Sequence, residues 1–506
     1  MKIAIQSAAL MGIDARRVEV EADILRGLPR FTIVGLPDAA VQEARERIRS
    51  AITNSGLPFP RTRITVNLAP ADVKKEGSLY DLPIALALLR AKRLIESERL
   101  ASSLFVGELA LDGTARGVKG VLSIAAMARN EGIRNLFVPA ENASEASLIK
   151  GIRVFPVSSL TDLANHLMAK SCIISSQRKC VILPHAMPYP GVDFSDIRGQ
   201  GHAKRALEIA AAGGHNVLLS GPPGSGKTLL AKTMVTILPA MAMEESLEVT
   251  RIYSVAGHLP ADRPLIMYRP FRSPHHTASG VALVGGGTSP KPGEISLAHR
   301  GVLFLDEFPE FPRTVLEYLR QPLEDGVISV SRAAGTCMFP AKFILVAAMN
   351  PCPCGYLTDP DRRCMCTASL VSKYQRKISG PLLDRIDFHV DVPKVAFEKL
   401  AGMSPGETSR DIRRRVEKAR EVQRRRFTGT SLVTNAEMSS RDTKTFCGID
   451  SRTVDLLRSA AERLQFSARS YFRILKVSRT IADLAGMPDI RVEHVAEALQ
   501  YRPKVE

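Results

Sequence analysis

The sequence predicts an α/β protein with a doubly wound sheet in its middle and a helical C-terminal part. Three observations carry this prediction. The stretch "NVLLSGPPGSGKTLLAKTM" (residues 216–234) places an apolar strand, a glycine loop and a helix in succession. Short apolar runs at residues 302–305, 343–347 and 388–391 alternate with other structure, as in a doubly wound sheet. After about residue 396 the periodicity is that of helices.

Composition shifts divide the 506 residues, which are too many for one compact core, into four parts. Residues 1–168 form a first α/β unit, in which strands such as "RFTIVGLP" alternate with helices such as "AAVQEARERIRSAITNSG". Residues 169–195 contain three prolines and little periodicity, which is typical of a linker. The doubly wound core is expected at residues 196–395 and the helical part at residues 396–506.

The composition favours a globular cytoplasmic protein with a polyanionic partner. The formal net charge of +17 suggests nucleic acid, although an excess of Lys and Arg can also be a solvated surface. No stretch reaches the roughly 18 apolar residues of a membrane helix, so no membrane partner is expected. The opening residues read as strands rather than as a signal peptide. In a reducing compartment, paired cysteines indicate a metal or catalysis before disulfides.

Residues 221–228 match the G-x-x-x-x-G-K-[ST] loop that binds nucleotide phosphates. Its glycines let backbone N–H groups close around phosphate oxygens at the start of the next helix. Lys227 is expected to reach the β- and γ-phosphates of ATP, and Thr228 to ligate Mg²⁺. The predicted ATP-binding residues are Gly221, Pro222, Pro223, Gly224, Ser225, Gly226, Lys227 and Thr228.

A buried strand that ends in acidic residues should complete a hydrolytic site, and "GVLFLDEF" (residues 301–308) supplies it. Asp306 is the predicted second Mg²⁺ ligand, and Glu307 is predicted to orient or activate water. Asn350 ends the next strand, "KFILVAAMN", at the edge where ligands collect in open α/β sheets. It is expected to bond the γ-phosphate or the attacking water, although an Asn after a strand is usually a turn residue.

These features together resemble an AAA+ ATPase, and three longer stretches resemble one branch of that class. "RPFRSPHHTASGVALVGGGTSPKPGEISLAHRGVLFLDEFPEF", "AAMNPCPCG" and "SGPLLDRIDFHVDVP" are similar to the magnesium-chelatase-like YifB/ComM family. The resemblance is most specific over residues 190–400 and runs nearly from end to end. It implies ATP and Mg²⁺ as cofactors, a homo-oligomeric ring of six subunits, and a helicase that promotes branch migration of DNA during natural transformation.

The same resemblance implies roles for three arginines. Arg385, in "LLDRID", matches the arginine finger that reaches the γ-phosphate bound by a neighbouring subunit, although it could also pair with Asp384 or Asp387. Arg469 resembles the sensor-2 arginine of a C-terminal helical lid, and Arg473, one turn along, is the alternative. "EDGVISVSRAAGTCMFPAK" is expected to form a hairpin, and hairpins here project into the channel of related helicases. Arg332 on it is therefore the candidate DNA contact.

Residues 1–168 resemble the proteolytic domain of Lon, which has a ribosomal S5-like fold. Leu79 falls at the position of Lon's serine nucleophile, with Ser78 one place early, and Lys119 lies near the position of its lysine. Because Leu79 has no hydroxyl, we expect a non-proteolytic relative used for assembly or substrate handling. Two alternatives to a DNA motor stay open: a Lon-like protease that uses Ser78, and a chelatase-type motor for inserting metal into a porphyrin.

Four of the eight cysteines lie between residues 352 and 366 in a C-x-C-x9-C-x-C pattern. Four thiolates are the ligand number of a tetrahedral zinc site, although the usual zinc spacing is C-x2-C or longer. Structural Zn²⁺, a redox pair and unligated cysteines are the three readings. The cysteines are Cys352, Cys354, Cys364 and Cys366.

Two further groups of side chains invite a functional reading. Adjacent His275 and His276 would point to opposite faces of a strand, so a shared metal is not expected there. Arg413, Arg420 and Arg424 share one face of an expected helix, which suggests either a contact with the DNA backbone or a solvated face.

Overall fold

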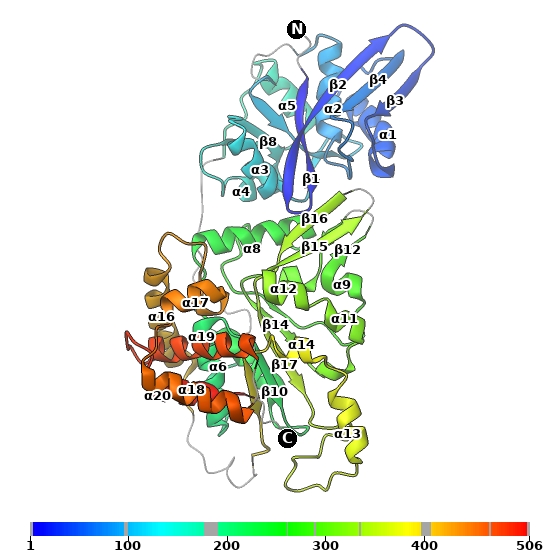
Figure 1. The fold of residues 1–506 in the computed structure, drawn as a ribbon. Helices are drawn as coiled ribbons and strands as arrows, with labels where there is room; N and C mark the ends of the chain where they lie inside the picture. The colour runs from blue at the N-terminus through cyan, green and yellow to red at the C-terminus, as the bar shows by residue number, and fades with distance from the viewer. Residues whose placement is uncertain are drawn as a thin grey trace.

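A computed structural model describes residues 4–95, 100–176, 191–260, 262–287, 290–332, 335–395, 406–464 and 467–502. We refer to residues 4–176 as the N-terminal unit, 191–395 as the core unit and 406–502 as the helical unit. In Figure 1 the N-terminal unit lies above the core unit, and the helical unit flanks the core unit on one side. Within the described ranges, no helix is long and apolar enough to cross a membrane.

The N-terminal unit is built on a mixed sheet of seven strands. They are β3 (Arg30–Val34), β4 (Arg63–Ala69), β2 (Asp14–Leu25), β1 (Ile5–Met11), β5 (Ser103–Phe105), β8 (Asn135–Pro139) and β9 (Arg153–Val157), in spatial order. β1 and β2 form an antiparallel hairpin, β2 pairs antiparallel with β4, and β3 runs parallel to β4. On the other side β5, β8 and β9 are parallel to β1.

Helices cover this sheet and share one apolar cluster with it. They are α1 (Ala39–Asn54), α2 (Asp81–Ala91), α3 (Val121–Asn130), α4 (Ala143–Ala146) and α5 (Leu160–Leu167). α1 begins where the Asp38 carboxylate accepts a hydrogen bond from the backbone N–H of Val41 at 2.8 Å. Its buried residues recur every three or four positions, as the sequence predicts for an amphipathic helix. β6 (Glu108–Leu109) and β7 (Ala115–Arg116) pair antiparallel in a separate two-stranded sheet.

The core unit contains a parallel sheet, as the sequence predicts. In spatial order its strands are β11 (Phe271–Arg272), β14 (Val302–Leu305), β17 (Ile344–Met349), β10 (Val217–Ser220) and β18 (Phe388–Asp391). Every residue of β14 and β17 is buried, because helices cover both faces of the sheet. Two of the strands predicted from the apolar runs have the expected bounds, and the third begins one residue late, at Ile344, and ends two residues late, at Met349.

Helices and two small hairpins complete the core unit. The helices are α6 (Gly201–Gly213), α7 (Lys227–Ile237), α8 (Met243–Ala256), α9 (Gly280–Val284), α10 (Glu294–Leu297), α11 (Arg313–Glu317), α12 (Arg320–Asp325), α13 (Ala368–Gln375) and α14 (Gly380–Leu383). The hairpins are β12 (Gly285–Gly286) with β13 (Lys291–Pro292), and β15 (Val327–Arg332) with β16 (Gly335–Pro340). α8, α9 and the first hairpin lie in the long interval between the glycine loop and β14.

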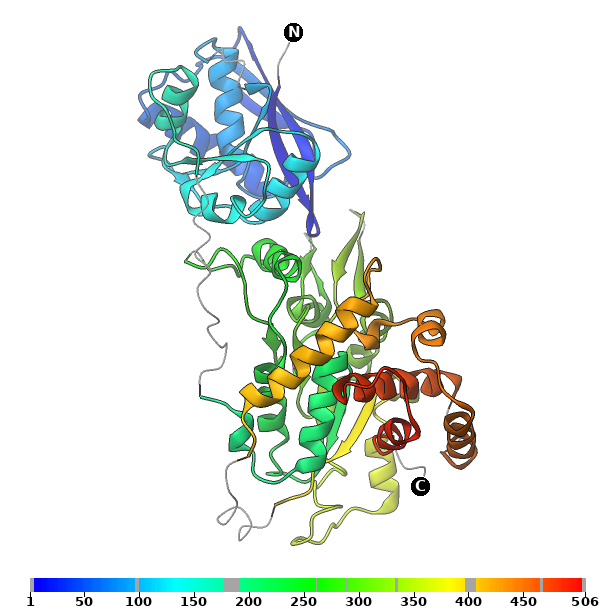
Figure 2. The ribbon, with the colours of Figure 1, turned by 90° about the vertical axis from the view of Figure 1, so that its left-hand side faces the viewer.

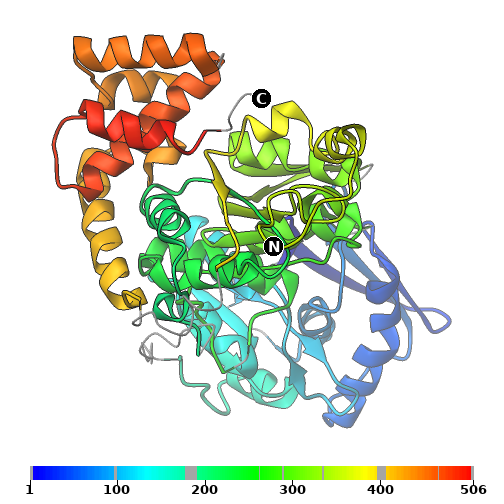
Figure 3. The ribbon, with the colours of Figure 1, turned by 90° about the horizontal axis from the view of Figure 1, so that it is seen from below.

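The helical unit completes the core of the parallel sheet rather than forming a core of its own. Its elements are α16 (Ser409–Arg426), η5 (Asn435–Glu437), α17 (Ser440–Phe446), α18 (Ser451–Leu464), α19 (Ala468–Leu484) and α20 (Val492–Leu499). One apolar cluster runs from Phe194 through the sheet to Tyr501. α16 crosses α6 and α7 (Figure 2), and the remaining helices project to one side when the molecule is seen from below (Figure 3).

The N-terminal unit contacts the core unit mainly through α8. α3 packs along α8, and the Ser254 hydroxyl on α8 donates to the buried Glu145 carboxylate on α4. Arg251 pairs with Asp14, the first residue of β2, at 2.9 Å. The side chain of Leu247, also on α8, packs against the apolar cluster of the N-terminal unit. Polar and apolar contacts therefore hold the two units together on one helix.

Parts of the expected domain boundaries lie outside the described residues. The end of the core and the start of the helical part, near residue 396, fall in 396–405, and most of the expected linker falls in 177–190. The four-part division of the chain at these positions stays a prediction.

Candidate nucleotide site

The glycine loop lies at the carboxyl end of β10 and turns directly into α7. Gly226 has a φ of 90°, which glycine adopts without strain, and α7 begins at Lys227. A Cβ at Gly221 would lie 2.2 Å from the carbonyl oxygen of Val392, just beyond β18, so the loop has no space for a side chain there. The sequence thus forms the expected strand, loop and helix, with the positive end of α7 at the loop.

Lys227 lies inside this loop. Its ammonium donates to the carbonyl oxygens of Gly221 at 2.7 Å and Pro222 at 2.9 Å. Its Nζ also lies 3.3 Å from Oδ1 of Asn350, the residue that follows β17. Burial lowers the pKa of Lys227, while the charge of Asp306 opposes that shift. ATP phosphates would offer this ammonium stronger, charge-assisted acceptors than the carbonyl groups do.

The predicted Mg²⁺ ligands meet across the sheet. Thr228 Oγ1 donates to Asp306 Oδ2 at 2.8 Å. The hydroxyl at the start of α7 and the carboxylate that follows β14 therefore lie side by side at this edge of the sheet. Hard oxygen ligands of this kind suit Mg²⁺ together with nucleotide phosphates. In the same loop, the buried Ser225 hydroxyl has no partner within the described residues, and a phosphate oxygen could satisfy it. The residues therefore fit Mg²⁺ and ATP.

Glu307 follows Asp306 in a left-handed backbone conformation with a φ of 51°. Its Oε2 lies 3.0 Å from Nδ1 of His276, in the loop after β11. From the sequence, His276 is considered only for a shared metal, and this contact with Glu307 is not predicted. The sequence signal that could have revealed this contact was the position of His276 after a strand, because the carboxyl ends of parallel strands share one edge of the sheet. His275 bonds Thr277 at 2.9 Å instead. Neither histidine lies in a strand, and their ring centroids are 4.1 Å apart, so the expectation that they point to opposite faces is wrong.

The two predicted catalytic arginines lie together. Arg385 is buried and pairs through Nη2 with one carboxylate oxygen of Glu324, while Arg469 donates to the other oxygen at 2.8 Å. Arg473 instead pairs with the buried Asp387 at 2.8 Å. Burial raises the pKa of Asp387, but the charge of Arg473, the hydrogen bond with His215 and the charge of Arg502 together outweigh it, and the net shift is downward. The Asp384 and Asp387 alternatives for Arg385 are therefore not the pairing that forms.

These arginines lie at the opposite end of the sheet from Lys227. β10 and β18 are parallel with Val217 opposite Phe388. Arg385 precedes Phe388, whereas the glycine loop follows the far end of β10. One strand length thus separates Arg385 and its Glu324 partner from the glycine loop of the same chain. In this conformation neither Arg385 nor Arg469 serves the nucleotide site of its own subunit.

The hairpin expected to carry Arg332 is present as β15 and β16. Arg332 is the last residue of β15 and pairs in register with Gly335, so it stands at the tip of the hairpin. Its side chain lies outside the described part of the structure. On β16, Cys337 lies next to Gly12 of the β1–β2 turn, so this hairpin also meets the N-terminal unit.

The four cysteine sulfurs converge, with all of them within 4.8 Å of one another. The sulfur of Cys352 lies 3.4 Å from that of Cys354 and 3.7 Å from that of Cys364. A tetrahedral site with bonds of about 2.3 Å places sulfurs about 3.8 Å apart, whereas a disulfide needs about 2.05 Å. The donor set and its spacing fit Zn²⁺. Gly355, which lies between Cys354 and Cys364, packs on Pro223 of the glycine loop, so the cysteine segment contacts the nucleotide site.

The basic stripe on α16 does not form an open face. Arg413 donates to the Thr236 carbonyl oxygen at 2.8 Å, and Arg420 donates to that of Ala211 at 3.0 Å. Arg424 alone of the three is exposed, and it pairs with Glu421. Both readings of the stripe, a DNA contact and a solvated face, are therefore wrong for Arg413 and Arg420, which pack on the core unit.

The residues compared with Lon's catalytic pair have different partners. Ser78 donates to the Glu108 carboxylate, and Leu79 is buried in the N-terminal unit. Lys119 lies over Gly257 at the end of α8, where a Cβ would come within 2.7 Å of its Nζ. Lys119 thus belongs to the contact between the two units.

Family models match three parts of the chain. The model described as magnesium chelatase, subunit ChlI, matches residues 193–400, that of subunit ChlI of Mg-chelatase matches residues 20–142, and that of the ChlI C-terminal part matches residues 406–502. Together with the glycine loop and the Thr228–Asp306 pair, they define a magnesium-chelatase-like AAA+ ATPase, a class that implies use of ATP and Mg²⁺.

Relatives extend this likeness over the whole chain. It is 44% identical to competence protein ComM of Haemophilus influenzae over 505 residues, 99% of this chain and 97% of the relative. It is 43% identical to the uncharacterized protein YifB of Escherichia coli over 505 residues, 98% and 96% of the two chains. The magnesium-chelatase 67 kDa subunit of Chlorobaculum tepidum matches at 29% over 166 residues, 32% of this chain and 23% of that one. The chain belongs to the YifB/ComM family of magnesium-chelatase-like proteins.

Proposed function

We propose that the protein is an ATP-driven DNA motor that works as a ring, a helicase promoting branch migration during natural transformation and homologous recombination. The proposal of a ring rests on one observation: Arg385 and Arg469 lie together at the end of the sheet opposite to Lys227. An arginine needed at the γ-phosphate must then come from a neighbouring subunit. The family supports an oligomeric AAA+ ATPase, and six subunits is the number we propose.

The geometry supports a division of labour at the shared site. Thr228 and Asp306 would hold Mg²⁺, which would supply neutralisation of the charge that develops during hydrolysis. Glu307 would orient and deprotonate the attacking water, and Asn350 would align the γ-phosphate beside Lys227. Arg385 from the next subunit would stabilise the transition state, with Arg469 beside it.

Three features support DNA as the partner in the cytoplasm. The net charge is +17, the β15–β16 hairpin ends at Arg332, and the relative in Haemophilus influenzae is named a competence protein. Contacts to a phosphate backbone predict binding that depends little on sequence and weakens steeply with salt. The stripe on α16 contributes nothing to this support, because Arg413 and Arg420 face the core unit.

The ATPase rate with and without DNA tests this proposal. Purified protein should hydrolyse ATP faster when single-stranded or branched DNA is added, and the stimulation should fall as salt rises from 50 to 200 mM, an interval over which phosphate contacts weaken greatly. Arg332→Ala should reduce the stimulation and leave the rate without DNA unchanged. A rate that no form of DNA alters would exclude a DNA-coupled motor.

A chelatase-type motor is the second candidate, because the core unit matches the ChlI model and a magnesium-chelatase subunit is similar over 166 residues. Such a motor would be stimulated by a porphyrin-binding partner rather than by DNA. The same ATPase measurement therefore separates the two candidates.

We also propose that the four cysteines bind one structural Zn²⁺. The ion would hold the segment after Asn350 against Pro223 of the glycine loop. All four positions of a tetrahedral metal would be taken by sulfur, so this metal would have no open position for catalysis. Elemental analysis should find one zinc per chain.

A further inference from the structure

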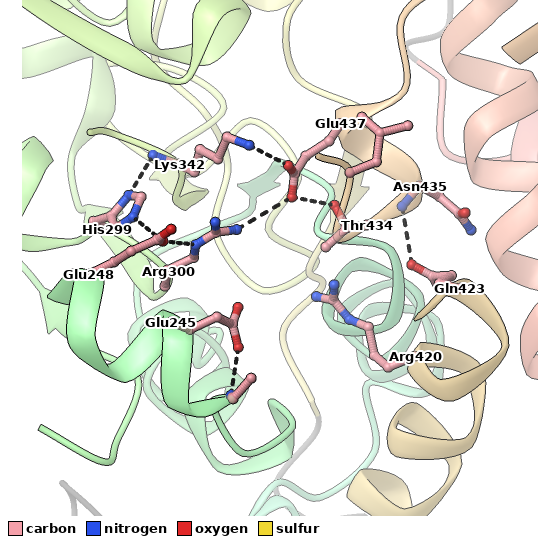
Figure 4. A network of polar contacts seen from close by, with 12 residues as sticks. Glu245, Glu248, His299, Arg300, Lys342, Arg420, Gln423, Thr434, Asn435 and Glu437 are labelled. Carbon is pink, nitrogen blue, oxygen red and sulfur yellow. Dashed lines mark hydrogen bonds and ion pairs between the residues drawn. The ribbon is translucent and has the colours of Figure 1, made fainter. Parts of the chain in front are cut away.

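A cavity of 740 Å³ lies between the start of the parallel sheet and the helical unit. Its walls include Asn216, which precedes β10, Ile344 at the start of β17, the end of α12, and side chains of α16 and α19. This is the end of the sheet away from the glycine loop, so the cavity is separate from the nucleotide site of the same chain. Figure 4 shows the polar network along it, between α8, η5 and α16.

Cationic side chains outnumber acidic ones in this cavity. Eight Lys and Arg residues line it, against five Asp and Glu residues, which leaves three positive charges in excess. Several of the cations are neutralised inside the protein. Arg269 pairs with Glu245 at 3.0 Å and Lys342 pairs with Glu437 at 2.7 Å, for example.

Two of the lining cations have no carboxylate within 4 Å in the described part of the chain. Lys476 donates to the carbonyl oxygen of Ala436 at 3.0 Å, and Arg420 donates through Nη2 to that of Ala211. Arg420 is only 9% exposed, and its Nε has no partner among the described atoms. In Figure 4 its guanidinium points from α16 toward Glu245 across the open space, without reaching it.

Such a buried cation is costly unless a charge compensates it. Desolvation of an unpaired ion costs several kcal/mol in protein interiors. Burial lowers the pKa of Arg420 to about 9, and the neighbouring charge of Arg269 adds to that effect. An anion in the cavity would remove this penalty and satisfy Nε.

We propose that this cavity binds a phosphate-class oxyanion at Arg420 and Lys476, either free phosphate or pyrophosphate or the phosphoryl groups of a nucleotide. A guanidinium presents paired N–H donors that match two oxygens of such a group, and an ammonium adds a point charge. The cavity is larger than a phosphate and has room for a nucleotide. Arg385 and Arg469, which our functional proposal assigns to a neighbouring subunit's ATP, line the same cavity. The anion at Arg420 and Lys476 is a second ligand beside them, and its binding does not depend on DNA.

Calorimetric titration of the full chain tests this site. The protein carries Lys227→Ala to disable the glycine loop, in buffer free of phosphate and sulfate, and pyrophosphate, phosphate and ADP are the probes. We expect one pyrophosphate site per chain, with a Kd that rises at least about tenfold in Arg420→Gln or in Lys476→Gln, as for loss of a charged hydrogen bond of 1.4 kcal/mol or more. Arg424→Gln, on the same helix but exposed, is the matched control and should bind like its parent.

The outcomes separate the sources of the ligand. Binding of pyrophosphate or phosphate alone assigns the site to a free anion, and tighter binding of ADP assigns it to a nucleotide, provided that both weaken in Arg420→Gln. Equal affinity in Arg420→Gln, Lys476→Gln and the control would overturn the proposal, and so would no binding of any probe. If Arg420→Gln fails to fold, as its circular dichroism would reveal, Lys476→Gln decides.

Discussion

Arg385 is buried against Glu324, and the second oxygen of that carboxylate binds Arg469. The pairing joins α12, the residue stretch before β18 and the start of α19 at the end of the sheet remote from Lys227. Glu324 thereby holds both arginines in position, and it lowers their mutual repulsion. Because the hydrogen bond from Arg385 also lowers the pKa of Glu324, the carboxylate stays charged at neutral pH.

Mixed rings should reveal that Arg385 acts on a neighbour. Lys227→Ala disables the glycine loop of its own subunit, and Arg385→Ala should lower kcat about 10³-fold while ATP still binds, as for other arginine fingers. Each variant alone should be inactive, but a mixture should regain part of the ATPase rate, because some junctions then combine an intact Lys227 with an intact Arg385. A mixture that stays inactive at every ratio would contradict action in trans.

His276 should position Glu307 for water activation. His276→Ala removes the 3.0 Å contact, so we expect kcat to fall about tenfold with little change in the KM for ATP, as for loss of one charge-assisted bond. His275→Ala is the control, because His275 bonds Thr277 and not Glu307. Steady-state kinetics of both variants are the measurement, and equal effects of the two substitutions would show that His276 has no special role.

Removal of the cysteine ligands should weaken ATP binding rather than catalysis. The segment with Gly355 packs on Pro223, so releasing it should loosen the glycine loop. We expect Cys354→Ser to lose bound zinc and to raise the KM for ATP several-fold, with thermal stability reduced as well. Cys172→Ser, at an exposed free cysteine outside this group, should change neither property. Unchanged zinc content in Cys354→Ser would refute the metal assignment.

The contact between the N-terminal and core units should respond to pH through Glu145. Burial raises the pKa of this carboxyl, and the hydrogen bonds from Ser254 and Leu122 only partly oppose the shift. An acid whose pKa is raised on folding stabilises the fold below its ordinary pKa and less as pH rises through the raised value. Glu145→Gln should therefore gain stability relative to the wild type between pH 4.5 and pH 7.5, as thermal unfolding would show. A difference that is constant over this interval would mean that Glu145 is not responsible.

Local sequence patterns were sufficient to predict the main strands of the core unit and the residues of the nucleotide site that follow them. The glycine loop, β14 and β17 could be predicted because a short apolar run indicates a buried strand and the glycine pattern indicates a phosphate-binding loop. Parallel strands then bring Thr228, Asp306 and Asn350 to one edge of the sheet. The contact of His276 with Glu307 depends on how the loop after β11 folds over its neighbour. No periodicity in the sequence encodes this loop conformation.

The contacts of Arg385 and Arg469 and the burial of the α16 arginines depend on long-range packing. Glu324 lies 61 residues before Arg385 and 145 residues before Arg469, so no spacing rule connects them. On α16 the periodicity correctly placed Arg413 and Arg420 on one face, but it could not show that α6 and α7 cover that face. Long Arg side chains can reach main-chain carbonyl groups under a packed helix, which makes a basic stripe a weak sign of a nucleic-acid surface.

Strand displacement from a labelled three-stranded DNA tests the central claim most directly. With ATP and Mg²⁺ the wild-type protein should release the displaced strand, and Lys227→Ala should release none. Release that continues in Lys227→Ala would show that ATP does not drive the reaction. A wild-type protein that hydrolyses ATP but leaves forked and three-stranded DNA intact would contradict the motor.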